Sequence, residues 1–486
     1  MGDVVIRNAT IVDGTGAPAV PGDVRVEGGR LTEVGEVGPA GAATEIDAGG
    51  LVLAPGFVDV HTHDDGALLR YPGMEFKISQ GCTSVVVGNC GFSAIPAVVG
   101  EPSLDLSSIT ATWSDLDGFR SAVHDQGVAV NAMALVGHNT VRQLVMPGER
   151  RPPKPDELDA MATHVELALE QGACGFSSGL IYRPGKWADT EEVTALAAMA
   201  APYDGIYATH MRNENDHLLE AVEEALQIGR DAGVAVQISH HKAAGRANWG
   251  KVAASLARVE QAVATGDRVT LDVYPYTAGS GPMIQYFDLA NPDPVLAEAI
   301  QLASCPAFRH YEGRMLVDIA AEQGMTPSEA VRHVLTAPEG DRTICIQHVM
   351  DEADVVTNLG HDLVMVGSDG LPDLDGRPHP RLFGTFPRVL GRYVREQGVL
   401  SLEQAVRRMT SLSCDVHGLA DRGRIVPGGW ADLVLFDPAV VADLATYEDP
   451  KVESAGVAAV WVNGELAFRD GQHTGSRAGR VLHYRR

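Results

Sequence analysis

The sequence predicts an α/β protein, a (β/α)8 TIM barrel carrying a small β-sandwich domain formed by the N- and C-terminal segments. Two observations predict this class. Apolar strand-like runs alternate with amphipathic helical segments through the middle of the chain, which is typical of parallel βαβ units. Short strands with glycine-rich turns concentrate near both ends, and 486 residues suffice for a large barrel plus a small added domain.

Eight strand candidates occupy the middle of the chain. They lie near residues 57–63, 83–90, 128–138, 173–180, 205–210, 234–240, 268–275 and 362–369. Helical segments separate many of them; between residues 217 and 230, for example, Leu218, Val222 and Leu226 share one helix face. Eight such units predict a closed barrel. One extra apolar run, residues 343–348, is assigned to an insertion between strands seven and eight.

The strand candidates at the two ends predict one small domain. Residues 4–7, 23–27 and 431–436 have strand-like patterns, and the Asn463-Gly464 pair between two apolar runs is typical of a hairpin. We therefore expect a β-sandwich domain from residues 1–55 plus 418–486, and a catalytic barrel from residues 56–417 with a short lid insertion near 279–350.

The overall charge and the cysteine pattern narrow the classes of partner and compartment. The net charge of −26 disfavours binding to nucleic acid or to an anionic membrane surface. The N-terminus lacks the basic and apolar regions of a signal peptide, and no run reaches transmembrane length. Six cysteines without a framework spacing fit a reduced, cytoplasmic protein whose oligomeric state is left open.

Side chains with metal-binding chemistry stand at the ends of five predicted strands. They are His61, His63, Cys90, His210, His240 and Asp369. Each alone has an ordinary structural explanation, but strand ends meet at one mouth of a barrel, and residues two apart on a strand point the same way. Imidazole and thiolate are zinc ligands. Together these residues predict a metal site.

The chemistry of such a site follows from the ligand types. Three protein ligands and an open position make a catalytic zinc site, which activates water and polarises a carbonyl. The Asp369 carboxylate can accept the proton of that water and pass it to a leaving nitrogen. The residues therefore predict metal-assisted hydrolysis of a C–N bond.

Several motifs carry a resemblance to a known family. They are HTHDD, VVVGNCGFS, THMRNE, SHHK, VYPYTAGS, GSDG, RPHPRLFGTFPRVLGRYVRE and GRIVPGGWADLVLFDP. Together they resemble the N-acyl-D-amino-acid deacylases (D-aminoacylases) of the amidohydrolase superfamily over nearly the whole chain. The resemblance implies zinc-dependent hydrolysis of the amide bond of N-acyl-D-amino acids, giving a carboxylate and a free D-amino acid.

The resemblance also assigns roles to residues. A cysteine, here Cys90, replaces the carboxylated lysine that bridges two metals in many amidohydrolases. Cys90, His210 and His240 are expected to hold one tightly bound zinc, and His61, His63 and Asp369 to line a second, weakly filled position, with Asp369 as general acid/base. Lys242, Tyr274 and Arg381 match residues that bind the substrate α-carboxylate, and an arginine fork with a lysine suits that group. Tyr182 and His138 are further pocket candidates, and His348 is expected to be structural.

The predicted insertion bears on the substrate side chain. It contains no Lys or Arg between residues 279 and 308, and it looks shorter than the lid of many relatives. Met283, Ile284, Tyr286 and Phe287 are expected to line the pocket. An unpaired buried carboxylate is costly, so apolar side chains are favoured over D-glutamate or D-aspartate.

Alternative functions stay open. One is a related amidohydrolase acting on D-residue dipeptides, on N-acyl-D-glutamate or on a cyclic amide; the GNCG motif and the missing carboxylated lysine argue against the cyclic amide. A remote alternative is a non-catalytic, metal-stabilised binding protein. That alternative predicts loss of Asp369 or of an open metal position, and the sequence retains both.

Overall fold

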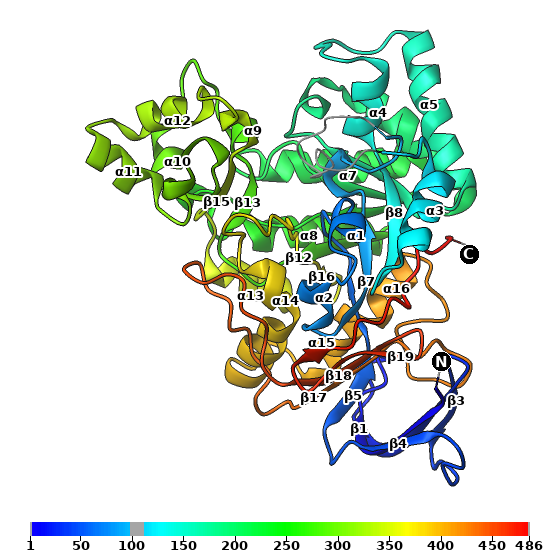
Figure 1. Ribbon diagram of the computed structural model, residues 1–486. Helices are drawn as coiled ribbons and strands as arrows, with labels where there is room; N and C mark the ends of the chain where they lie inside the picture. Colours follow the sequence, from blue (N-terminus) through cyan, green and yellow to red (C-terminus); the bar gives the residue numbers. More distant parts are fainter. Residues whose placement is uncertain (1, 98–110, 485–486) are drawn as a thin grey trace.

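Eight parallel strands form a barrel at the centre of the molecule (Figure 1). The computed structural model describes residues 2–97 and 111–484. In spatial order the barrel strands are β16 (Val364–Val366), β12 (Val269–Val273), β11 (Ala235–Ile238), β10 (Ile206–His210), β9 (Gly175–Gly179), β8 (Asn131–Gly137), β7 (Cys82–Val87) and β6 (Phe57–Asp59). The predicted (β/α)8 barrel is confirmed.

The barrel closes at a seam between its first and last strands. β6 and β16 share no ladder, and a single bridge between Thr62 and Gly370 joins the segments that follow them. Two backbone hydrogen bonds support it: the Asp369 amide donates to the His61 carbonyl at 2.7 Å, and the His63 amide to the Gly370 carbonyl at 3.0 Å. The candidate metal ligands His61 and His63, which follow β6, and Asp369, which follows β16, therefore meet at the seam.

Helices surround the barrel and cover its outer face. Their bounds are α1 (Ala67–Arg70), α2 (Glu75–Ile78), α3 (Leu116–Gln126), α4 (His138–Val145), α5 (Pro155–Glu170), α6 (Thr190–Ala197), α7 (Leu218–Ala232), α8 (Lys251–Ala264), α13 (Glu352–Leu359), α14 (Arg381–Arg388), the π-helix Val389–Glu396, α15 (Leu402–Met409) and α16 (Ser411–Val416). On α7, Leu218, Val222 and Leu226 are buried, as their spacing predicts.

The two ends of the chain build one nine-stranded sheet, at the bottom of Figure 1. Its N-terminal strands are β1 (Val4–Ile11), β2 (Val20–Glu27), β3 (Arg30–Gly35), β4 (Thr44–Asp47) and β5 (Val52–Pro55). Its C-terminal strands are β17 (Leu433–Phe436), β18 (Val457–Val462), β19 (Glu465–Arg469) and β20 (Gln472–His473). Antiparallel pairing of β5 with β17 joins the two halves into a continuous sheet.

Alternation along β17 explains how this sheet is held. Leu433 and Leu435 belong to a core within the folded sheet, which also contains Trp461, whereas Val434 and Phe436 belong to the core shared with the barrel. Successive strand residues point to opposite faces, so one face closes on itself and the other packs on the barrel.

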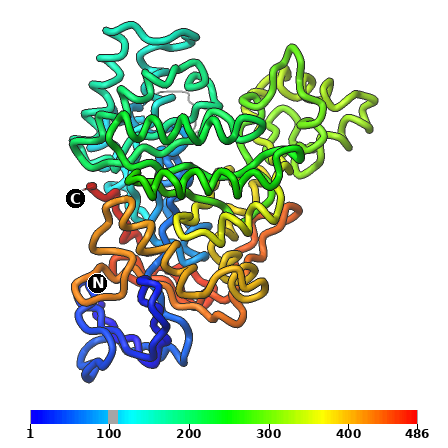
Figure 2. The backbone as a smooth tube through the Cα atoms, turned by 180° about the vertical axis from the view of Figure 1, so that it is seen from behind, coloured from blue at the N-terminus to red at the C-terminus, as the bar shows by residue number. Residues whose placement is uncertain are grey.

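Residues 279–350 project from the side of the barrel as a separate folded unit, visible in both Figure 1 and Figure 2. It contains the antiparallel strands β13 (Gly279–Pro282), β15 (Ile344–Gln347) and β14 (Ile300–Ser304), with helices α9 (Met283–Tyr286), α10 (Pro294–Glu298), α11 (Leu316–Gln323) and α12 (Pro327–Leu335). The extra apolar run lies here, between the seventh and eighth barrel strands, as predicted. The unit has its own core, around Phe287, Leu302 and Val331.

Most barrel strands end before their predicted limits. The predicted strand 57–63 ends at Asp59, and the predicted strand 362–369 ends at Val366. His210 is the last residue of β10. The other candidate metal ligands lie on short segments that follow the barrel strands. Among the described residues, no helix combines the length and apolar character that crossing a bilayer requires.

Candidate metal centre and active site

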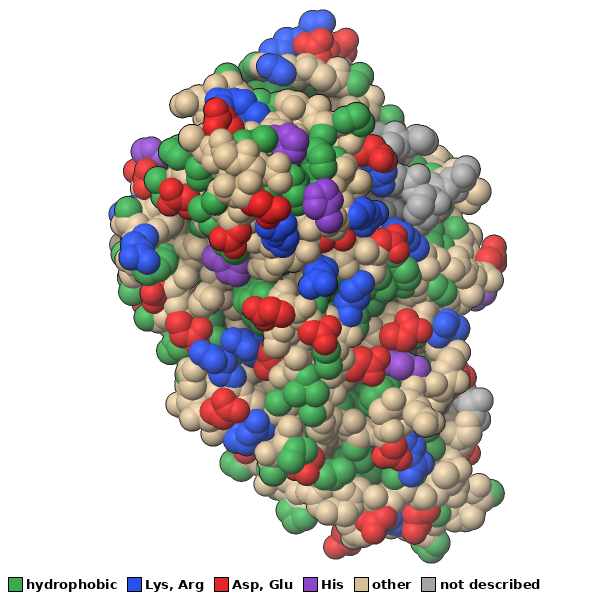
Figure 3. Space-filling view, turned by 60° about the vertical axis from the view of Figure 1, so that its left-hand side comes forward, with side chains coloured by type: hydrophobic (Ala, Val, Ile, Leu, Met, Phe, Trp, Pro, Cys, Tyr) green, Lys and Arg blue, Asp and Glu red, His purple; other side chains and the backbone are tan. Residues whose placement is uncertain are grey.

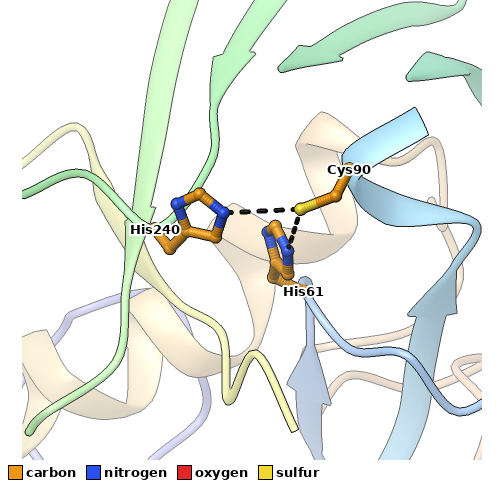
Figure 4. A group of neighbouring side chains, drawn as sticks. All are labelled: His61, Cys90 and His240. Atoms are coloured by element: carbon orange, nitrogen blue, oxygen red, sulfur yellow. Dashed lines mark hydrogen bonds between the residues drawn. The ribbon is translucent and has the colours of Figure 1, made fainter. Parts of the chain in front are cut away.

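Cys90 lies at the centre of a cluster of imidazoles at the barrel mouth (Figure 4). Its Sγ is 3.4 Å from His61 Nε2, 3.4 Å from His240 Nε2 and 3.6 Å from His210 Nδ1. These histidines follow or end the first, sixth and fifth barrel strands, and all four side chains are buried. The structure thus brings together the cysteine and three histidines that the sequence placed at strand ends.

The local backbone forces Cys90 toward this cluster. Cys90 has a φ of 55°, in the left-handed region that non-glycine residues rarely adopt. A Cβ on Gly179 would lie only 2.1 Å from the Cys90 carbonyl oxygen. A Cβ on Gly88 would lie 2.2 Å from the Leu135 carbonyl oxygen. Only glycine permits the neighbouring strands to approach the turn so closely.

His63 and Asp369 complete a second group beside the first. Asp369 Oδ1 is 3.2 Å from His63 Nε2 and 3.6 Å from His61 Nε2. His61 therefore contacts both Cys90 and Asp369, and it lies between the two groups. The positions predicted for two metals are adjacent in the structure, with Cys90 and His61 at their common edge.

The charges at the site favour a cation. Burial alone raises the pKa of the Cys90 thiol, but His61, His240 and His210 lower it well below its usual value. Burial likewise opposes ionisation of Asp369, yet Arg381 and the histidines hold its pKa well below the usual range. The pKa of His63 is raised to about 9, since Asp369 and Cys90 outweigh the opposing effect of burial. A thiolate and a carboxylate are the forms that bind metal.

Two buried carboxylates contact the outer nitrogens of the histidines. Glu214 Oε1 is 3.1 Å from His240 Nδ1, and Glu214 Oε2 is 3.4 Å from His210 Nε2. Asp272 Oδ1 is 3.3 Å from His61 Nδ1. Carboxylates in such positions fix the tautomer and orientation of metal-binding imidazoles. Neither carboxylate was predicted from the sequence, although Glu214 closes the THMRNE motif and Asp272 stands two residues before Tyr274.

The donor set fits zinc. Zn–S bonds of about 2.3 Å and Zn–N bonds of about 2.0–2.1 Å at a tetrahedral angle separate the two ligand atoms by roughly 3.6 Å. The three distances from Cys90 Sγ, between 3.4 and 3.6 Å, match that separation. The ligand atoms of His61, Cys90 and His240 all lie within 4.8 Å of one another. The same is true of the ligand atoms of His61, His63 and Asp369.

A small pocket of about 20 Å³ lies against these groups. Its walls are His63, Cys90, Phe92, Tyr182, Ser280, Gly281, Pro282, Gln285, Asp369 and Leu371. Two contacts join the insertion to the barrel above it: the Tyr182 and Tyr286 hydroxyls are 3.3 Å apart, and the Arg183 amide donates to Gln285 Oε1 at 3.0 Å.

The predicted substrate-binding residues fall into two groups. Arg381 is buried, its Nη1 is 2.9 Å from Asp369 Oδ2, and its guanidinium lies 4.5 Å from the centre of the Tyr274 ring. Lys242 Nζ is 2.5 Å from Glu214 Oε1 and 2.8 Å from His240 Nδ1. These residues and Tyr182, whose ring is 4.5 Å from the His210 ring, surround the metal-type cluster.

His138 lies apart from this group. It begins α4, and its Nε2 is 2.9 Å from Glu192 Oε1, which also pairs with Arg142 at 2.5 Å. Its side chain is fully buried in that ion-pair cluster, which is separate from the walls of the pocket. His348 Nε2 lies 3.0 Å from Gln301 Oε1 within the insertion.

The apolar residues expected to line the pocket lie elsewhere. Met283 and Phe287 are buried in the insertion's own core, and Ile284 packs against it. Tyr286 reaches the mouth beside Tyr182, with the two hydroxyls 3.3 Å apart and the ring centres 6.1 Å apart. Met283 on α9 and Phe287 directly after it are four residues apart, and they share one core with Ile300 and Leu302 of β14. Ser280, Pro282 and Gln285 take their place in the pocket wall.

Comparisons with known proteins agree with this geometry. The chain belongs to the amidohydrolase family, whose sequence profile matches residues 44–468, and it is therefore a hydrolase. It is 43% identical to the D-aminoacylase of Alcaligenes xylosoxydans xylosoxydans, over 99% of this chain and 97% of that one. It is 42% identical to the N-acyl-D-glutamate deacylase of the same organism, over 99% and 96% of the two chains.

A solved structure shares the whole architecture. The crystal structure of N-acyl-D-glutamate deacylase from Bordetella bronchiseptica, complexed with zinc and a phosphonate inhibitor that mimics the tetrahedral intermediate, is 41% identical. The two superimpose with a TM-score of 0.91 over 99% of each chain. The fold and the family of the chain are thus established together.

Proposed function

We propose that this enzyme hydrolyses the amide bond of N-acyl-D-amino acids with zinc as cofactor, releasing a carboxylate and a free D-amino acid. The observation that carries the proposal is the cluster of three imidazoles around Cys90. It occurs in a chain that is 43% identical to a D-aminoacylase over nearly its full length. The donor types, their separations and the cation-favouring charges all support a zinc ion there.

Cys90, His210 and His240 hold the tighter zinc in this proposal, and His61, His63 and Asp369 offer a second, weaker position. Zinc supplies Lewis-acid activation of water and of the scissile carbonyl. Glu214 and Asp272 orient the imidazoles through their outer nitrogens. The histidines around Cys90 hold the pKa of its thiol well below the usual value, which favours the thiolate that binds metal.

Asp369 moves the proton. Its carboxylate lies in the pocket wall next to His63, where it can accept a proton from the attacking water. Asp369 then passes that proton to the departing nitrogen, which completes cleavage. A neutral amine is a far better leaving group than the amide anion that would otherwise depart. Arg381, at 2.9 Å, keeps Asp369 ionised and oriented before the substrate arrives.

Carboxylate recognition is local in a protein of net charge −26. Arg381 and Lys242 both lie by the Tyr274 ring, with the guanidinium carbon 4.5 Å and Lys242 Nζ 5.8 Å from the ring centre. An arginine fork pairs bidentately with a carboxylate, and a lysine adds a point charge. On the face shown in Figure 3, by contrast, basic and acidic side chains are mixed over the surface.

An apolar side chain is the proposed preference. Phe92, Pro282 and Leu371 offer apolar surface in the pocket, and its described lining contains no Lys or Arg. The insertion contributes two uncharged polar residues to the wall, Ser280 and Gln285, and Gln285 already accepts a hydrogen bond from the Arg183 amide. Sequence identity does not decide this point, because relatives named for different substrates match about equally well.

The wider organisation is proposed on the same basis. We infer that residues 1–55 with 418–486 act as a supporting domain, and that residues 56–417 with the insertion near 279–350 carry the catalysis. The partner is a small-molecule substrate. A cytoplasmic location is supported by six cysteines that are all buried as free thiols.

A panel of N-acetyl amino acids tests the function. Both enantiomers of the methionine, leucine, phenylalanine, glutamate and aspartate derivatives are incubated with zinc-loaded enzyme, and release of the free amino acid is measured. D-Methionine, D-leucine and D-phenylalanine derivatives should be hydrolysed with kcat/KM about tenfold or more above the acidic ones, because an unpaired carboxylate is costly in the pocket. Preference for D-glutamate would refute the apolar assignment and direct attention to Arg183. No hydrolysis of any member would refute the function.

A further inference from the structure

A buried lysine lies under the metal cluster, at the seam where the barrel closes. Lys77 is on helix α2 and is fully buried. Its Nζ donates to Asp59 Oδ2 at 2.5 Å, to Ser368 Oγ at 2.9 Å and to Thr62 Oγ1 at 3.1 Å. The single ammonium therefore joins the first barrel strand, the loop after it and the segment after the eighth strand.

Its partners extend the network to both sides of the seam. Asp59 Oδ1 accepts from the Ser368 amide at 2.7 Å, and Asp59 Oδ2 accepts from Ser368 Oγ at 2.6 Å. Ser368 Oγ also accepts from the Gly370 amide at 3.0 Å. Asp369 lies between these two tethered residues, and its φ of 48° is one that few non-glycine residues adopt. The network holds Asp369 in that conformation.

The same network sets the position of the histidine pair. Asp59 and Thr62 bracket His61, and Thr62 directly precedes His63. No ladder joins β6 to β16 in the described barrel, and only the two backbone hydrogen bonds beside the Thr62–Gly370 bridge are described between the segments that follow them. Side chains therefore carry more of the contact here than between the other barrel strands. Among the described residues, Lys77 is the one whose side chain contacts Asp59, Thr62 and Ser368 together.

We propose that Lys77 is a positioning residue: its ammonium clamps the two sides of the seam and thereby fixes His61, His63 and Asp369 relative to one another. The tighter group of Cys90, His210 and His240 depends on it far less, because only His61 of the Cys90 neighbours lies at the seam. Losing the clamp should therefore weaken the second metal position and the proton transfer while sparing the first metal.

Lys77→Met tests the proposal, since methionine has a similar length but donates no hydrogen bond. Ser368→Ala removes one arm of the clamp and leaves the Lys77–Asp59 ion pair in place. Lys154→Met is the control, because the Lys154 side chain is 66% exposed and pairs with Glu157 at 3.8 Å, away from the seam. Each full-length variant is titrated with zinc alone in competition with a chelator, and kcat and KM for N-acetyl-D-methionine are measured separately.

Lys77→Met should bind its first zinc as the wild type does and its second about tenfold or more weakly. Its kcat should fall about 100-fold, which is the effect of misplacing reacting groups by about 1 Å, with KM changed less than threefold. Ser368→Ala should show both effects to a smaller degree, and Lys154→Met neither.

Second-zinc affinity and kcat within threefold of wild type in folded Lys77→Met would overturn the proposal. Equal loss of both zinc ions, in step with loss of folded protein, would overturn it too, because that pattern marks a scaffold role. If Lys77→Met yields no folded protein, Ser368→Ala decides by the same two measurements. The kinetic measurements rest on the proposed function. If the wild type hydrolyses no N-acyl-D-amino acid, that function fails, and the zinc titration alone decides the role of Lys77.

Discussion

Glu214 should control the zinc affinity of the tighter group although it is not one of the predicted ligands. It is buried, and its two oxygens lie 3.1 Å from His240 Nδ1 and 3.4 Å from His210 Nε2. Burial alone raises the pKa of Glu214, but Lys242, His210 and His240 lower it well below its usual value. The carboxylate is therefore charged and makes both imidazoles better donors on their opposite nitrogens.

Glu214→Gln keeps the shape of the side chain and removes its charge. Loss of a carboxylate behind a metal-binding histidine costs about 10- to 100-fold in metal affinity, equivalent to about 1.4–2.8 kcal/mol. Because two of the three tight ligands share Glu214, we expect the upper part of that range. The substitution also removes the anionic partner of Lys242 at 2.5 Å, so the charge of a buried cation near the metal is no longer balanced.

Competition with a fluorescent chelator measures this affinity directly. Glu224→Gln is the matched control, because Glu224 pairs with Arg212 at 2.9 Å and is half-buried. The control should bind zinc like the wild type. A zinc affinity of Glu214→Gln within twofold of wild type, in protein with an unchanged melting temperature, would refute the orienting role of Glu214.

Three further substitutions test the individual roles. Cys90→Ala should lose most of its tightly bound metal by elemental analysis, since the central donor is gone; wild-type metal content would remove the cysteine from the site. Asp369→Asn should keep its metal and its melting temperature but lose at least about 100-fold in kcat, because the amide cannot carry a proton; activity within a few-fold of wild type would end that assignment. Arg381→Met should raise KM by a similar factor for every N-acyl amino acid hydrolysed, because all carry the α-carboxylate; a loss confined to one side chain would contradict it.

The sequence was sufficient for the barrel and for the set of cysteine and histidine side chains that meet at its mouth. The period of apolar runs identified all eight strands, and the rule that barrel strand ends share one mouth brought together His61, Cys90, His210 and His240, which lie up to 179 positions apart in the chain. These predictions depend only on periodicity and topology, which a single sequence records.

The sequence did not determine which atoms face the metal or which residues lie behind them. Cys90, His240 and Asp369 have φ values of 55°, 35° and 48°, and such strained conformations depend on tertiary contacts. Glu214 and Asp272 gain their roles only through contacts across strands. No local pattern marks them as different from surface carboxylates.

The pocket wall was the weakest part of the sequence prediction. Met283 and Phe287 were expected in the wall, but the insertion has its own core and buries them there. An apolar residue in an insertion can face either the insertion or the barrel, and its identity does not distinguish the two. His138 illustrates the same point, because its buried partner Glu192 lies 54 positions away in the chain.

Metal removal and restoration test the central claim most directly. The enzyme is stripped with a chelator, dialysed, and titrated with zinc while hydrolysis of N-acetyl-D-methionine is followed. We expect the stripped protein to retain less than about 1% of the original rate, and about one equivalent of zinc to restore most of it. N-acetyl-L-methionine should remain intact throughout. Full activity after verified removal of the metal, or equal hydrolysis of both enantiomers, would contradict the account.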